Sequence, residues 1–161
     1  MNMVQIEISR HDWASMWCGC RRTAEHIPHD FLAALAGPPP EDAGAGWADS
    51  HAYVQSNLMQ PAVATASIAM AALADGAPVE HRHHLLAVLQ VLSTGEQDDI
   101  ADECLKVVQG GTWILYEEIV SGRSIVAAAY AYELLDLLED EADRLKSVQR
   151  AARENLPTYL R

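Results

Sequence analysis

Two cysteines and two histidines near the N-terminus have the side chains of a zinc site. One glycine separates Cys18 from Cys20, and His26 and His29 follow shortly after. Thiolates and imidazoles are the usual ligands of tetrahedral zinc, and four of them would close such a site. The spacings are tight, however, and no second cysteine pair follows. The sequence therefore predicts that the chain binds no metal or other cofactor. In that case the two cysteines are ordinary small apolar residues. Zinc bound by these four side chains is the alternative.

Further histidines gather at the start of a predicted helix, in the run from His81 to His84. His81 and His84 are three positions apart, so they share a helix face. Glu80 and His83 form one Glu-x-x-His motif. Di-iron helical bundles need two such motifs and further carboxylates, and no second copy is present. This pattern favours a partly exposed, pH-sensitive helix face.

A pocket is the next candidate, because polar side chains beside aromatic ones can line a ligand site. The solvent edge of an amphipathic helix is the competing interpretation of the same pattern. The residues considered for the pocket are Trp47, His51, Gln55 and His81, and those considered for catalysis are His51, His84 and Glu117.

Acidic residues crowd two neighbouring predicted helices. Glu117 and Glu118 lie in one, and Tyr130, Glu133 and Asp136 lie in the next. A run of charges is typically a solvated face, and its best functional use is to attract a basic partner. Tyrosines are common in protein-binding surfaces. These five residues are the predicted recognition face.

The chain has 161 residues, of which half are hydrophobic, and a formal net charge of −12. This length fits a single helical domain, 1–161, with a buried core. The negative charge disfavours nucleic-acid binding, which needs a basic surface for the phosphates. It favours a basic protein or peptide as the partner.

Membrane insertion is also disfavoured. No apolar stretch approaches the roughly 20 residues that cross a bilayer, and no signal peptide is recognisable at the N-terminus. The three cysteines are an odd number, which disfavours a disulfide framework. The expected location is the cytoplasm.

Helical periodicity dominates the chain from residue 60 onward, and a Pro/Gly-rich loop is predicted over 37–46. Residues 1–10 alternate weakly between apolar and polar, which indicates a short strand or an extended lead-in. The predicted helices are 13–18, 31–36, 47–59, 61–74, 78–94, 97–109, 113–120, 125–138 and 141–154.

Helix pairs recur along this pattern. The unit of residues 61–94 is similar to the unit of residues 113–139, and a period of about 40–47 residues marks arrays of helix pairs. The chain thereby resembles the bacterial HEAT-repeat-containing proteins. The residues that carry the resemblance are Asp12-Trp13, Gly19, 24–28 with Leu32 and Leu35, Pro61 to Ala66, Glu103 to Val108 with Gly111, and Ala127 to Ala129 before Leu134-Leu135.

The resemblance implies an all-α fold of stacked antiparallel helix pairs, a fragment of a right-handed α-solenoid that binds a partner. It implies no catalytic residues, since such repeats carry many functions. The predicted function is thus a non-enzymatic adaptor or accessory protein, of which an immunity protein is one kind, with a homodimer as the expected assembly. The alternative is a small all-helical enzyme acting on a peptide or natural product.

Overall fold

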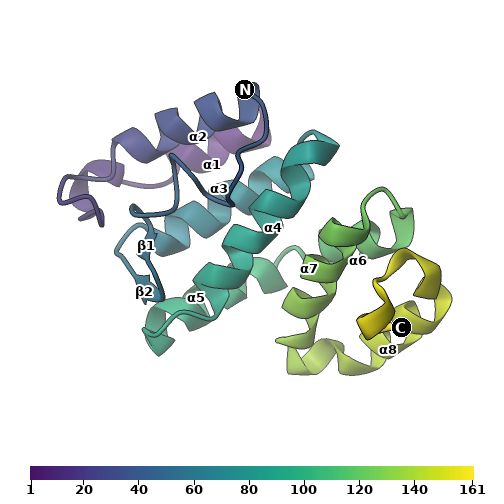
Figure 1. The fold of residues 1–161 in the computed structure, drawn as a ribbon. Coiled ribbons are helices and arrows are strands. Elements are labelled where there is room, and N and C mark those ends of the chain that lie inside the picture. Colours follow the sequence, from purple (N-terminus) through teal and green to yellow (C-terminus); the bar gives the residue numbers. More distant parts are fainter.

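The computed structural model describes all residues 1–161 and is mostly helical (Figure 1). Its α-helices are α1 (Met3–Ser9), α2 (His26–Ala36), α3 (Ala62–Ala74), α4 (Val79–Ser93), α5 (Asp98–Gln109), α6 (Thr112–Ser121), α7 (Ile125–Asp136) and α8 (Ala142–Ala151). Short 3-10 helices cover Trp13–Ser15, Glu139–Glu141, Arg153–Asn155 and Thr158–Leu160. Two short strands, β1 (Tyr53–Val54) and β2 (Asn57–Leu58), pair in an antiparallel hairpin. No helix has the length and apolar character needed to cross a membrane.

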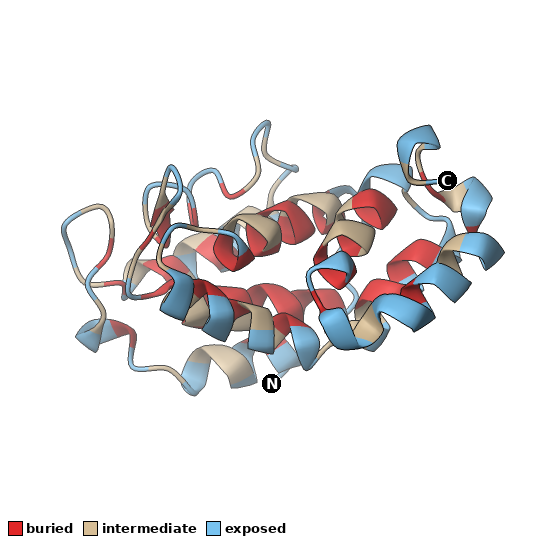
Figure 2. Cartoon of the chain, turned by 90° about the horizontal axis from the view of Figure 1, so that it is seen from below, coloured by how far each residue is buried: buried red, intermediate tan, exposed pale blue.

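Helix α3 lies at the centre of the larger half of the fold. Its sequence, AVATASIAMAALA, is apolar around the whole circumference, and ten of its thirteen residues are buried. A helix of this kind must be covered on every side. Helices α1, α4 and α5 all pack on it, and its alanines allow a close approach. Figure 2 shows the buried residues on the facing sides of these helices.

The second half of the chain is attached through α4. Helix α7 packs on both α4 and α6, and α8 closes the end of this group. Packed helix pairs are therefore present, as α3 with α4 and α6 with α7. Helix α5 does not belong to either pair, since it packs on α3 and α4 together.

Local sequence signals place the helices after residue 60 correctly. The predicted segments 61–74, 78–94, 97–109 and 113–120 correspond to α3 to α6 within one or two residues. Gly122 takes the left-handed conformation, with φ of 66°, and ends α6. The Ser124 hydroxyl accepts a hydrogen bond from the Ala127 amide and caps α7, as predicted.

The N-terminal segment corrects one expectation. Residues 1–10 form the helix α1 rather than a strand or an extended lead-in. Asn2 caps this helix by accepting a hydrogen bond from the Gln5 amide, and the Gln5 side chain accepts one from the Asn2 amide. This reciprocal pair starts a helix without a serine or threonine.

The helix predicted over 47–59 is wrong. The segment contains turns and the β1–β2 hairpin, and both Ser50 and Gln55 have left-handed backbones, with φ of 65° and 56°. Contacts distant in sequence hold it in place: the Glu96 amide donates to the Ser56 carbonyl at 2.8 Å, and the Leu58 amide donates to the Gln97 side chain. Tertiary contacts have thus overridden the amphipathic pattern.

One buried ion pair joins the two halves. The guanidinium of Arg82 on α4 donates to the carboxylate of Glu118 on α6, and both side chains are almost inaccessible to solvent. Arg82 also donates to the carbonyls of Leu73 and Ala77, at 3.3 and 3.2 Å, and Arg123 donates to the same Glu118 oxygen at 3.2 Å. These bonds satisfy groups that burial would otherwise leave unpaired.

We expect Glu118→Ala to lower the free energy of unfolding by about 3–5 kcal/mol, because it leaves the buried Arg82 charge without its partner. Glu117→Ala is the matched control: Glu117 also pairs with Arg123, but its side chain is 53% exposed, so the loss should stay below about 1 kcal/mol. Urea unfolding followed by circular dichroism measures both. Equal losses for the two variants would contradict this role for the pair.

Candidate functional site

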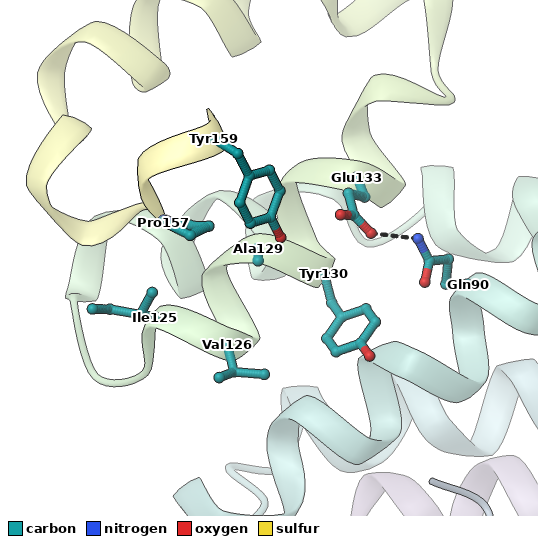
Figure 3. A pocket seen from close by; sticks show the side chains of 8 residues that line it. All are labelled: Gln90, Ile125, Val126, Ala129, Tyr130, Glu133, Pro157 and Tyr159. Atoms are coloured by element: carbon teal, nitrogen blue, oxygen red, sulfur yellow. Dashed lines mark hydrogen bonds between the residues drawn. The ribbon is translucent and has the colours of Figure 1, made fainter. Parts of the chain in front are cut away.

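A groove opens beside α7, between the end of α4 and the C-terminal tail (Figure 3). Its volume is about 410 Å³. The residues that line it are Gln90, Ile125, Val126, Ala129, Tyr130, Glu133, Pro157 and Tyr159. Most of them are apolar, with the polar groups gathered at one end. This is the usual composition of a binding site, in which few polar groups set the orientation.

The floor of the groove follows from the helical period of α7. Val126, Tyr130 and Glu133 are at positions i, i+4 and i+7, so they share one face. The opposite face holds the buried residues that pack on α4 and α6, among them Ala127, Ala128, Ala131, Leu134 and Leu135. Because that face is committed to the core, the Val126 face is left to solvent, and Val126 is 53% exposed.

The C-terminal tail forms the opposite wall and is held firmly. Leu156 is fully buried. The Asn155 side chain donates to the carbonyl of Ile119 at 2.9 Å, and the Gln149 side chain donates to that of Leu160 at 2.8 Å. Tyr159 is 72% exposed beside these anchors. The groove is therefore formed before any partner arrives.

The polar end is acidic. The Gln90 amide donates to the Glu133 carboxylate across the gap between α4 and α7 (Figure 3). Asp136 is exposed close to it, at the end of α7. An apolar side chain followed by a cationic group would meet complementary surfaces here.

The predicted recognition face is divided by the fold. Tyr130 and Glu133 line the groove, with Asp136 near its acidic end. Glu117 lies on α6 and pairs with Arg123. Glu118 is a correction, because its side chain is buried in the pair with Arg82 and is absent from the surface.

The structure does not bring the residues predicted to form a pocket together in a single pocket. Trp47 packs on Phe31 in the core, with ring centroids 4.6 Å apart. Gln55 is exposed in the hairpin turn, and His81 is buried, where its Nε2 donates to the Gly37 carbonyl at 3.1 Å. His51 belongs to a different cluster, described next. None of the three main surface cavities is lined by these four residues.

Cys18, Cys20 and His26 do lie together, with His51 as the fourth member of the cluster. His29 is exposed and faces Asp30 instead. Burial raises the pKa of the Cys18 thiol to about 11. Burial and the neighbouring His26 lower the pKa of His51, which favours its neutral ring.

The residues considered for catalysis lie on separate elements. His51 is in the cluster, Glu117 is on α6, and His84 stacks on His83 in α4 with ring centroids 3.9 Å apart. Burial, then the neighbouring histidines, lowers the pKa of both His83 and His84. The polar groups that the enzyme alternative needs in one pocket are therefore dispersed.

The groove residues Gln90, Ile125, Val126, Pro157 and Tyr159 were not among the sequence candidates. The spacing of Val126, Tyr130 and Glu133 was a usable signal, since it combines apolar, aromatic and acidic side chains on one face. The return of the tail to α7 has no comparable local signal.

The lowered pKa of His83 and His84 predicts a pH-dependent stability. Between their folded pKa and the ordinary value of 6.5, the unfolded chain binds more protons, so stability falls as the pH falls through this range. Replacing both residues with glutamine should reduce the loss between pH 7.5 and 5.5. Urea unfolding at the two pH values measures it, and an unchanged difference between wild type and variant would contradict the assignment.

Comparisons with known proteins do not add to this geometry. No protein-family model, curated protein or solved structure matches the chain.

Proposed function

We propose that the protein is a non-enzymatic binding module that receives a segment of a basic partner protein in the groove beside α7. The observation that carries the proposal is the exposure of Ile125 and Val126, at 49% and 53%, inside a preformed groove. Aliphatic side chains gathered in a concave surface are the usual mark of a binding site. The groove volume, about 410 Å³, suits a few side chains of a peptide.

Charge supports a basic occupant. The chain carries a net charge of −12. Glu133 lies at the polar end of the groove, and the exposed Asp136 follows one turn later on α7. Such a field speeds the approach of a cationic partner and repels an anionic one. An amphipathic segment with an apolar anchor and a neighbouring lysine or arginine has the matching chemistry.

The arrangement of the helix pairs is also a proposal. We infer a short α-solenoid similar to HEAT arrays, in which the pair α6–α7 stacks on the pair α3–α4 through the contact of α7 with α4. Helix α5 departs from a strict two-helix repeat. A homodimer is part of this proposal, and a monomer mass independent of concentration in light scattering would overturn it.

Peptide selection tests the binding function. Phage-displayed peptides selected on the full chain should carry an aliphatic or aromatic residue next to lysine or arginine. Val126→Asp should weaken their binding at least about tenfold, because it places a charge on the apolar floor. Fluorescence anisotropy of the labelled peptides measures the affinity.

Val120→Asp is the matched control, since Val120 is an equally exposed valine, at 59%, on α6 and outside the groove. It should leave the affinity unchanged. Glu133→Gln should weaken binding a few-fold, with a smaller dependence on salt. Selected peptides that are acidic, or that bind all three variants like the wild type, would reject the groove as the site.

A further inference from the structure

We propose that Cys18, Cys20, His26 and His51 bind one Zn²⁺ in a closed structural site. The four side chains come from three separate segments: the turn after Trp17, the first residue of α2, and the loop before β1. Their ligand atoms all lie within 4.8 Å of one another. Chance clustering of exposed acidic groups is common, but this cluster consists of thiols and imidazoles, the preferred ligands of structural zinc.

Five of the six distances between the ligand atoms are close to those of a tetrahedral zinc site. With zinc–sulfur bonds of about 2.3 Å and zinc–nitrogen bonds of about 2.0 Å, tetrahedral ligand atoms are separated by roughly 3.3–3.8 Å. Cys18 Sγ is 3.3 Å from Cys20 Sγ, 3.7 Å from His26 Nε2 and 3.4 Å from His51 Nδ1. Cys20 Sγ is 3.7 Å from His26 Nε2, and the two imidazole nitrogens are 3.0 Å apart. These five distances are within about half an ångström of the tetrahedral values. The remaining one, between Cys20 Sγ and the His51 ring, lies within 4.8 Å, so closing the site requires an approach of up to about one ångström there.

The tautomer of His26 is set for metal binding. Its Nδ1 is 3.0 Å from the carbonyl oxygen of Thr23. A carbonyl only accepts, so the proton is on Nδ1, and the Nε2 lone pair is directed at the cluster. Histidine ligands of zinc characteristically donate their other N–H to a carbonyl or carboxylate in this way.

Both cysteines lie on a tight hairpin, residues 17–23, that turns their thiols to one side. Trp17 and Thr23 form an antiparallel bridge, and the Cys18 amide donates to the Arg22 carbonyl at 2.8 Å. Arg21 takes the left-handed conformation, with φ of 65°. Such strain in a residue other than glycine persists where the surroundings impose it.

Gly19 docks this hairpin on the loop that carries His51. Its amide donates to the His51 carbonyl at 2.9 Å. A Cβ atom at this position would lie 2.9 Å from Val54 Cγ2 and 3.0 Å from the Ser50 carbonyl oxygen, closer than packed atoms approach. The absence of a side chain at Gly19 therefore brings the cysteines within reach of His51.

The number of protein ligands indicates that the metal has a structural role. Four protein ligands fill a tetrahedral zinc site and leave no position for water or substrate, which distinguishes a structural site from a catalytic one. Cys18 is buried and the other three are half-buried. The segments joined contain little regular structure, since only α2 and two short hairpins lie between Ser15 and α3. A metal bound there would hold in place segments of the chain that make few contacts with the helices.

Metal analysis tests the proposal on the tag-free full chain, purified under reducing conditions without chelator. About one zinc per chain is expected. Replacement by Co²⁺ should give the visible absorption of a tetrahedral cobalt–thiolate site. Chelator should lower the midpoint of thermal unfolding, and added Zn²⁺ should restore it. A chain without zinc that also fails to give the cobalt spectrum would overturn the proposal.

Two histidine variants separate this site from the one that sequence spacing suggests. His51→Gln should reduce zinc to less than about a tenth of one equivalent at a limiting concentration of added metal, because a ligand is lost. His29→Gln should retain the full equivalent, since His29 is exposed and outside the cluster. Loss of zinc from His29→Gln with retention in His51→Gln would reject the assignment. Should His51→Gln fail to fold, the cobalt spectrum of the wild type and the zinc content of His29→Gln still decide the question.

Discussion

Helix α3 needs cover on all sides, and most of the fold can be understood from that requirement. Its alanines and few larger residues leave no polar stripe that solvent could hydrate. Helices α1, α4 and α5 supply the cover, and small side chains let them pack closely. Because α4 is used on one side by α3, its remaining surface is available to α7. The second half of the chain is then attached there.

The attachment through α4 has two consequences. It buries Arg82 and Glu118, and either charge would be costly to bury without the other. Arg82 also donates to the carbonyls of Leu73 and Ala77, and Glu118 also accepts from Arg123. The attachment also leaves the solvent face of α7 uncovered between α4 and the tail, where the exposed valine and isoleucine lie. The groove is thus a product of how the halves join, and no element forms it alone.

A part of the fold can be predicted from the sequence when interactions between neighbouring residues determine it. It cannot be predicted in this way when contacts between distant residues do. Helices after residue 60 could be located from the sequence because their ends depend on local groups such as Ser124 and Gly122. The segment 47–59 could not, since its turns depend on bonds to Glu96 and Gln97 across the fold.

The candidate sites show the same division. Cys18, Cys20 and His26 could be recognised because they are close in sequence, whereas sequence spacing selected His29 as the fourth member in place of His51. Glu118 was assigned to the surface from its acidic neighbours, but the distant Arg82 decides its burial. In the groove, Tyr130 and Glu133 could be recognised on their own helix, while Tyr159 reaches it only through the folded tail.

The proposed zinc site and the proposed groove depend on different parts of the molecule. The cysteine–histidine cluster joins loops around α2 and the hairpin, on the side of α3 and α4 away from α6 to α8 (Figure 1). The groove is built from α7, the tail and one residue of α4. A metal at the first site would reach the groove through α4, which contacts the loop after α2 by the bond of His81 to Gly37 and also packs on α7. Since α4 is held in place by its packing on α3, α5 and α7, the metal is expected to stabilise the N-terminal loops without setting the shape of the binding surface.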